Sequence, residues 1–472
     1  MNRELKNDWA QLEALLEAAK QQGSSYLSNL HHRATSVDFV FHPQKHLPDV
    51  GIGSAGALQQ FNNRLERLMV ASSGPRYWGF VTGGTTPAAI VGDWLTSIYD
   101  QNSQSTKGYG DVSANIEIET VQLLLDLFGL PHDFFGGFVT GATMSNFTCL
   151  GVARQWAGRQ HGKDFAKEGV TGTVKILAAT PHASALKSLA MLGLGSNNSI
   201  KLKVLEGNRE AMDVSDLEYH LRELGGEPAI VISSGGTVNT VDFDDLVSIA
   251  KLKIKYRFWW HIDAAFGGFA ACSSEHKQLV QGWADADSIT IDLHKWLNVP
   301  YESALFFVKQ QHNVLQVETF QNSNAPYLGN PMENFDYLNF LPENSRRLKA
   351  LPAWFTLIAY GKKGVAEMVD NNIRLAKLLG DLIGQNPQFE LLAPVRLNTV
   401  CFTLRGEENP ERVQEFLERL NATRKVFMTP TVYKGRKGIR AALVNWRTEE
   451  EDVRMVAGLM TGLKMAIAVN FL

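Results

Sequence analysis

Residues 258–268 read Phe-Trp-Trp-His-Ile-Asp-Ala-Ala-Phe-Gly-Gly, an apolar run that ends in one aspartate followed by small residues. This pattern predicts a buried strand that delivers Asp263 to its carboxyl end. A second run, residues 287–296, reads Asp-Ser-Ile-Thr-Ile-Asp-Leu-His-Lys-Trp and ends in His294 and Lys295. Asp263 and Lys295 are therefore expected at the ends of successive strands.

Strands and helices alternate on both sides of these two segments. Short runs rich in valine, isoleucine and phenylalanine are predicted strands, at residues 138–140, 175–178, 201–205, 229–233, 258–262, 288–292 and 304–308. Helical periodicity separates several of them, at residues 145–159, 182–192, 214–224 and 244–255. The alternation predicts an α/β fold with a mostly parallel central sheet covered on both faces, and such sheets bind ligands at the carboxyl ends of their strands.

The two flanking regions have a different pattern. The chain before residue 77 is mainly helical, most clearly at 58–70. After residue 343, helices at 349–360, 365–382 and 411–420 accompany strands at 389–393, 399–404 and 439–444. We therefore expect an N-terminal helical segment (1–80), a large cofactor-binding domain (81–342) and a small C-terminal α+β domain (343–472).

Composition limits the classes of function. The 472 residues carry 46 Lys and Arg against 49 Asp and Glu, and no basic stripe is visible, which argues against nucleic acid or an anionic membrane as a partner. Cys149, Cys272 and Cys401 form no C-x-x-C pair, so a disulfide framework is not expected and a cytoplasmic location suits the chain. The charged N-terminal helix does not resemble a signal peptide, and the apolar tail 455–472 is expected to dock as a helix.

Two other patterns are set aside. Residues 51–56 match G-x-G-x-x-G, but no strand leads into them and Arg76 stands where an acidic residue is needed, so a loop before a helix is the favoured interpretation. No metal is expected, because four neighbouring histidines match no familiar ligand spacing: His31, His32, His42 and His46.

A lysine at a strand end is costly to bury unless it has a chemical use. The use that fits Lys295 is a Schiff base with pyridoxal 5′-phosphate, and Asp263 supplies the acid that this cofactor's pyridine nitrogen requires. The turn at 140–146 opens a predicted helix and offers amides and hydroxyls for the phosphate. His182 follows a strand and is placed to stack on the ring. Each residue alone has an ordinary explanation as a cap or surface group; their order along the chain indicates the cofactor.

With these segments the chain resembles the group II pyridoxal-phosphate-dependent amino-acid decarboxylases, the family of the aromatic-L-amino-acid and glutamate decarboxylases. The resemblance covers nearly the whole chain, and the matching stretches are residues 74–80, 140–146, 178–184, 235–237, 261–265, 294–296, 326–328 and 346–348. It implies the aspartate-aminotransferase type of fold (fold type I) and a homodimer with active sites at its interface.

The resemblance also implies residue roles. Lys295 is the Schiff-base lysine, Asp263 binds the pyridine nitrogen and His182 stacks on the ring. Further cofactor contacts are expected at Thr143, Ser145, Thr237, Ala265, Ser288, Asp292 and His294.

Substrate contacts are expected at Phe80 and Thr82, and Tyr327, in a polar stretch fit for a lid over the neighbouring subunit's site, is the expected donor of a proton to the substrate Cα. Four positions depart from the family pattern: Gly74 stands where histidine is usual, Ser345 stands where glycine is usual, and the other two are Asp292 and Val238. Asp292 stands where related aromatic decarboxylases tend to have asparagine, and Val238 stands where a second threonine is common.

The implied activity is that of a carboxy-lyase, which releases CO2 and an amine from an L-amino acid. Five aromatic residues suggest an aromatic-rich neighbourhood and favour an aromatic substrate: Tyr77, Trp78, Phe80, Trp296 and Trp354. An acidic or other polar substrate (glutamate or aspartate type) stays open, as do an aldehyde synthase, a carbon–carbon lyase and an aminotransferase on the same cofactor. A non-catalytic binding protein is disfavoured because both Lys295 and Asp263 are present.

Overall fold

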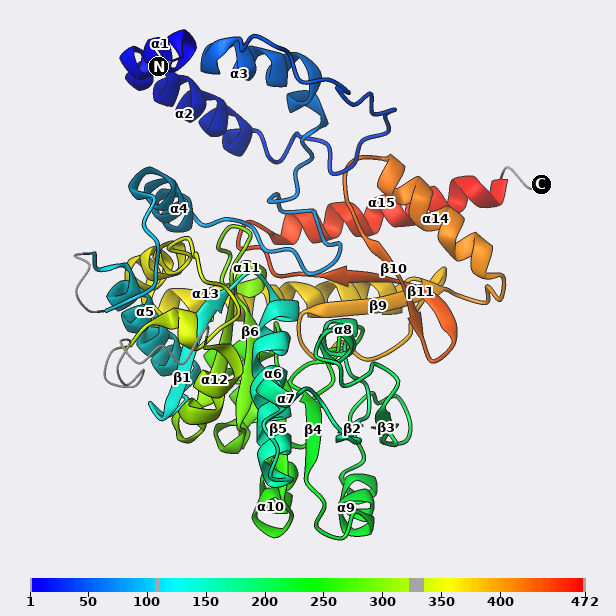
Figure 1. Ribbon diagram of the computed structural model, residues 1–472. Helices are drawn as coiled ribbons and strands as arrows, with labels where there is room; N and C mark the ends of the chain where they lie inside the picture. Colours follow the sequence, from blue (N-terminus) through cyan, green and yellow to red (C-terminus); the bar gives the residue numbers. More distant parts are fainter. Residues whose placement is uncertain (1, 107–110, 322–334, 470–472) are drawn as a thin grey trace.

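The computed structural model describes residues 2–106, 111–321 and 335–469. Its centre is a seven-stranded sheet of order β1-β7-β6-β5-β4-β2-β3 (Figure 1). The strands are β1 (Phe134–Val139), β2 (Lys175–Ala178), β3 (Ser199–Lys201), β4 (Ala229–Ser234), β5 (Phe258–Asp263), β6 (Ser288–Asp292) and β7 (Ala304–Lys309). Neighbours from β6 to β3 are parallel, and β7 runs against both of its neighbours. The predicted α/β fold with a mostly parallel sheet is confirmed.

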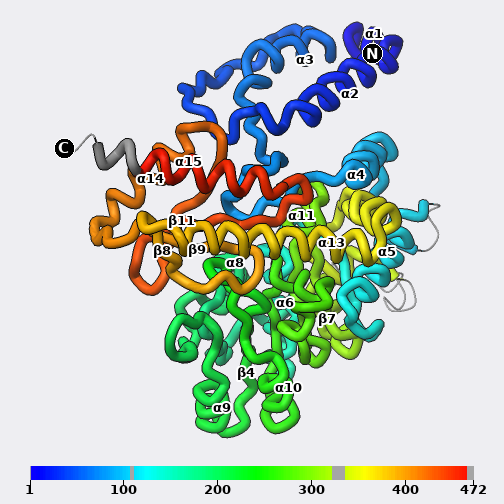
Figure 2. Tube along the Cα trace, turned by 180° about the vertical axis from the view of Figure 1, so that it is seen from behind, coloured from blue at the N-terminus to red at the C-terminus, as the bar shows by residue number. Residues whose placement is uncertain are grey.

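Helices cover both faces of this sheet because its strands are apolar on both sides; every residue of β5 is buried. On one face α6 (Ala142–Gln160) crosses β4 to β7, with α8 (Ala183–Met191) and α12 (Asn313–Phe320) beside it. On the other face lie α5 (Ser113–Phe128), α10 (Leu246–Lys255) and the first half of α13 (Ala350–Gln385) (Figure 2). The two apolar layers fix the strand ends that carry the site.

The small C-terminal unit has a four-stranded antiparallel sheet of order β10-β11-β9-β8. Its strands are β8 (Phe389–Leu391), β9 (Thr399–Leu404), β10 (Thr429–Tyr433) and β11 (Arg436–Ala442). The second half of α13, α14 (Pro410–Ala422) and α15 (Glu450–Val469) pack on it around one apolar core. The remaining described α-helices are α1 (Arg3–Ala10), α2 (Leu12–Ser28), α3 (Gly53–Arg64), α4 (Pro87–Tyr99), α7 (Phe165–Glu168), α9 (Val214–Glu223) and α11 (Leu293–Trp296).

The N-terminal helices α1 to α3 form one end of the molecule, where α2 lies next to α4, and the chain after them returns to the small domain (Figure 1). Trp78 donates its backbone N–H to the Phe427 carbonyl at 2.9 Å and accepts from the Ala442 N–H at 2.9 Å. Its indole belongs to the apolar core of the small domain. Since this segment contacts the C-terminal unit, the predicted division at residue 80 stays a prediction.

Two predicted elements differ in detail. The strand expected at 201–205 is β3, which ends at Lys201, because the N–H of Lys203 donates to the Asp216 carboxylate at 2.9 Å and not to a strand. The helices expected at 349–360 and 365–382 form the single run α13, interrupted at Gly361, whose φ is 59° and ψ −173°. No helix in the described ranges is long and apolar enough to cross a membrane.

Candidate active site

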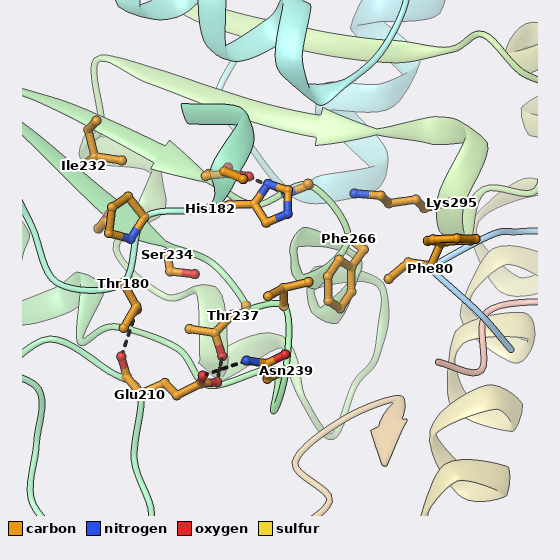
Figure 3. A pocket seen from close by; sticks show the side chains of 18 of the residues that line it. Phe80, Thr180, His182, Glu210, Ile232, Ser234, Thr237, Asn239, Phe266 and Lys295 are labelled. Carbon is orange, nitrogen blue, oxygen red and sulfur yellow. Dashed lines mark hydrogen bonds between the residues drawn. The ribbon is translucent and has the colours of Figure 1, made fainter. Parts of the chain in front are cut away.

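A cavity of about 640 Å³ lies at the carboxyl ends of β4, β5 and β6. Seven residues predicted for the site line it: Phe80, His182, Thr237, Asp263, Ala265, His294 and Lys295. Figure 3 shows the Lys295 side chain pointing across the cavity toward His182. Residues from distant parts of the sequence thus meet where the fold places ligands.

Lys295 lies in the short helix α11, which begins at Leu293 directly after β6. Its Nζ lies 2.8 Å from Asp292 Oδ2, and its side chain is mostly buried. Asp292 Oδ1 is buried without a hydrogen-bond partner among the described residues. Gly83 packs directly against the backbone of Lys295. A Cβ at Gly83 would lie 2.0 Å from the Lys295 carbonyl oxygen. Only glycine permits this close approach.

Asp263 and His182 flank the interior of the cavity. Asp263 is 9% exposed, and its Oδ2 accepts a hydrogen bond from Asn146 Nδ2 at 3.0 Å. His182 caps α8 by accepting the Ser184 N–H at Nδ1. Burial lowers the pKa of His182, so its ring is mainly neutral at pH 7. A neutral imidazole suits stacking on a pyridine ring.

The start of α6 lies beside His294. The N-cap is Gly141, and no side chain caps this end. A Cβ at Gly141 would be 3.8 Å from His294 Cε1, so the free amides of the first turn open next to the His294–Lys295 pair. Burial lowers the pKa of His294, whose ring stacks on Tyr301 with centroids 4.3 Å apart.

Five predicted contacts lie outside the cavity lining: Thr82, Thr143, Ser145, Ser288 and Asp292. Ser145 Oγ and Ser288 Oγ are fully buried, the first bonded to Thr290 Oγ1 and the Leu305 carbonyl and the second to Trp259 and His261. Thr143 sits in the first turn of α6, and Thr82 is buried with its Oγ1 3.3 Å from the Tyr301 hydroxyl. Tyr327 lies outside the described residues.

Three charged residues in the lining were not predicted: Glu210, Arg440 and the buried Asp244. Glu210 accepts hydrogen bonds from the hydroxyls of Thr237 at 2.6 Å and Thr240 at 2.7 Å. Arg440 donates from Nη1 to the Val238 carbonyl and from Nη2 to the Phe80 carbonyl. Burial lowers the pKa of Arg440. Neither Glu210 nor Arg440 lies in a local pattern, because Glu210 is in a loop before α9 and Arg440 in a strand of the small domain.

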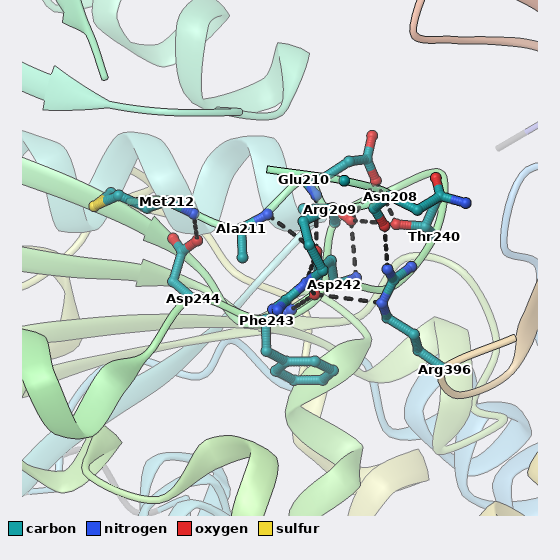
Figure 4. Close-up of polar contacts among 12 residues, drawn as sticks. Asn208, Arg209, Glu210, Ala211, Met212, Thr240, Asp242, Phe243, Asp244 and Arg396 are labelled. Atoms are coloured by element: carbon teal, nitrogen blue, oxygen red, sulfur yellow. Dashed lines mark hydrogen bonds and ion pairs between the residues drawn. The ribbon is translucent and has the colours of Figure 1, made fainter. Parts of the chain in front are cut away.

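The loop that carries Glu210 is fixed by Asp242 (Figure 4). The Asp242 carboxylate accepts the backbone N–H of Glu210 at 2.7 Å and of Ala211 at 3.1 Å, and Arg209 Nε at 2.8 Å. Arg396, from the small domain, completes the cluster at 3.4 Å. Glu210 therefore occupies a fixed position at the cavity wall.

These residues fit pyridoxal phosphate. The wall offers a lysine amine for the aldehyde, a carboxylate for the pyridine nitrogen, a neutral imidazole for the ring face and a helix start for the phosphate. The buried, unpartnered oxygen of Asp292 beside Lys295 is a polar atom that a bound group would satisfy.

Comparisons with known proteins agree with this geometry. Residues 56–405 match the model of the pyridoxal-dependent decarboxylase conserved domain. An aromatic-L-amino-acid decarboxylase of Bacillus atrophaeus is 26% identical over 90% of this chain and 88% of its own. A phenylacetaldehyde synthase of Arabidopsis thaliana is 25% identical over 80% of each chain. A crystal structure of Oryza sativa TDC with PLP and tryptamine superposes with a TM-score of 0.88, at 21% identity, over 97% of this chain and 98% of that one.

The chain belongs to the pyridoxal-dependent decarboxylase family. It is accordingly a carboxy-lyase of fold type I, and its cofactor is pyridoxal phosphate. The family and the cofactor predicted from the sequence are confirmed.

Proposed function

We propose that this protein decarboxylates an aromatic L-amino acid and releases CO2 and the aromatic amine. The observation that supports an aromatic substrate is the aromatic lining of the cavity. Phe80, Phe266 and Tyr301 line the same cavity as Lys295. Relatives named for aromatic amino acids support it, among them a tryptophan decarboxylase of rice and a tyrosine decarboxylase of Arabidopsis thaliana.

In this proposal four groups hold the cofactor: Lys295 at its aldehyde, Asp263 at its pyridine nitrogen, His182 on the ring face, and the start of α6 with His294 at its phosphate. When bound, pyridoxal phosphate supplies an electron sink for the electron pair left by departing CO2. Asp263, as an anion in a site with little water, favours the protonated pyridine nitrogen that makes this sink effective.

The test is a panel assay of CO2 release and amine formation across the natural amino acids. We expect aromatic substrates to react fastest, and Lys295→Ala to abolish both products. Borohydride reduction should attach the cofactor to Lys295 in the wild-type protein and to no residue in the variant. Preferential turnover of glutamate or aspartate, or amino transfer to a keto acid without CO2, would refute the proposal.

An aldehyde synthase is the second candidate, since a phenylacetaldehyde synthase is among the relatives. Such an enzyme consumes O2 and yields aldehyde, ammonia and peroxide where a decarboxylase yields amine. Tyrosine at position 327 favours the amine, because a phenol can return a proton to the substrate Cα. Oxygen uptake equal to CO2 release in the panel assay would select the synthase.

We further propose a homodimer in the cytoplasm. Apolar side chains of α4 support the dimer, since Val91, Trp94 and Ile98 are 44–59% exposed. Light scattering should give about twice the chain mass of 52.4 kDa; a monomer mass would refute it. The three free cysteines suit a reducing compartment, and burial raises the pKa of each thiol to about 12.

A further inference from the structure

Behind the cavity wall, Asp263 is held by a fully buried amide. Asn146 Nδ2 donates to Asp263 Oδ2 at 3.0 Å, and Asn146 Oδ1 lies 2.8 Å from His261 Nε2. Asn146 and His261 are both completely inaccessible to solvent. Because the amide oxygen faces the imidazole, Nε2 of His261 carries a proton and donates it.

The same amide reaches His182 through a second branch. Asn146 Nδ2 also donates to Ser184 Oγ at 3.0 Å, and Ser184 Oγ lies 2.7 Å from His182 Nδ1. His182 Nδ1 already accepts the backbone N–H of Ser184. Nδ1 is therefore an acceptor, the Ser184 hydroxyl donates to it as well, and the ring proton of neutral His182 is on Nε2.

The hydrogen bonds at the other end of this network, around His261, determine which groups donate and which accept. The Trp259 indole, which can only donate, gives its N–H to Ser288 Oγ at 3.0 Å, and the Ser288 hydroxyl donates to His261 Nδ1 at 2.9 Å. Burial lowers the pKa of His261 to about 4, so the ring is neutral at pH 7. A neutral ring can accept at Nδ1 while it donates at Nε2, as both contacts require.

We propose that Asn146 and His261 are positioning residues that orient the two side chains on either side of the cofactor, Asp263 and His182. A flipped amide would place an oxygen against the Asp263 carboxylate and N–H against the His261 proton, so one orientation is strongly preferred. The buried His261 ring thereby fixes the orientation of the Asp263 carboxylate. Through Asn146 and Ser184 it also fixes the tautomer of His182. The inference rests on the proposed placement of the cofactor.

His261→Phe tests this, because it keeps a ring of similar size and removes the donor to Asn146. We expect the dissociation constant for pyridoxal phosphate to rise about tenfold or more, since a buried amide loses its partner, and the visible absorption band of the bound cofactor to shift. His261→Gln, whose amide N–H can reach Asn146, should restore both quantities to within about threefold of wild type.

His312→Phe is the matched control. His312 Nε2 contacts Asp287 Oδ1 at 2.8 Å and its ring packs on Trp259, so the variant loses a hydrogen bond and keeps the ring contact. It should lower the melting temperature and leave cofactor affinity and spectrum unchanged. Asn146→Asp, of the same size, loses both donated bonds and should reproduce the His261→Phe effect even where that variant folds poorly.

Wild-type affinity and spectrum in both His261→Phe and Asn146→Asp would overturn the inference while leaving the proposed function intact. So would changes that His312→Phe reproduces or that His261→Gln fails to restore. A wild-type protein that takes up no pyridoxal phosphate would overturn the inference together with the proposed function.

Discussion

Asp263 is the residue whose charge the proposed chemistry needs most. It is almost buried, and removing one partner of a buried ion pair costs about 3–5 kcal/mol. Asp263→Asn keeps the shape and removes the charge, so kcat should fall at least about a hundredfold while the circular dichroism spectrum stays that of the wild type. Turnover near the wild-type rate would show that another group holds the pyridine nitrogen.

Tyr327 is a prediction from the sequence alone. Tyr327→Phe removes the phenolic acid and keeps the ring, so CO2 release should continue while amine formation falls about 10²–10⁴-fold. Aldehyde, ammonia and oxygen uptake should appear in place of the lost amine, measured with an oxygen electrode and chromatography. An unchanged amine yield without oxygen uptake would assign the proton to another donor.

Two of the predicted site residues that lie in the cavity lining stand at a strand end or just after one. Asp263 and Lys295 line the cavity because a parallel sheet brings its strand ends to one edge. Ser145, in α6, and Ser288, in β6, were expected to contact the cofactor, but both side chains are buried away from the cavity lining; the spacing of residues along the chain does not give the direction of a side chain. Glu210 and Arg440 reach the wall through tertiary contacts between distant segments, which a single sequence does not display.

Among the helices, α13 carries a break that a substitution can test. Gly361 has φ 59° and ψ −173°, a conformation that is essentially restricted to glycine, and a Cβ there would meet nothing within 4 Å. Gly361→Ala should therefore destabilise the protein by about 1–3 kcal/mol through the backbone alone. Gly384, exposed in the same helix with ordinary dihedrals, is the control: Gly384→Ala should stabilise by about 0.5–1 kcal/mol. Urea denaturation measures both, and equal effects would contradict the assignment of strain.

Element prediction succeeded where burial imposes a pattern. β5 and β7 are continuous apolar runs because both faces are covered, so their bounds follow from composition. β10 was not predicted, because it is an edge strand with a proline and alternating exposed residues. The sequence predicted two helices separated at the position where α13 is interrupted. That the two form one continuous run depends on packing against both the large and the small part of the chain.

For the molecule as a whole, one buried carboxyl links stability to pH. Burial raises the pKa of Asp244 to about 6 from an ordinary 3.8. Between these values the folded state binds more protons than the unfolded state, so this group's contribution to stability is largest below about pH 4 and is lost as pH rises through 6. The loss is roughly 3 kcal/mol.

Asp244→Asn isolates this contribution. The amide cannot accept from both the Met212 and Ser234 N–H groups, so the variant is less stable at low pH, but it does not titrate. The stability difference between wild type and variant, from urea denaturation, should therefore shrink between about pH 4 and pH 7. A difference that is constant with pH would mean that Asp244 does not titrate in this range.

The hydrogen bonds between Trp78 and the small domain affect the order in which parts of the protein can fold during synthesis. Phe427 and Ala442, the hydrogen-bond partners of Trp78, are synthesised some 350 residues later, so the segment that ends in Phe80 lacks these contacts until then. Phe80 therefore takes its place in the cavity wall after the central sheet has been synthesised. A nascent chain can assemble the central sheet early, but the Phe80 side of its cofactor pocket is held in place only after residues 427–442 have been synthesised.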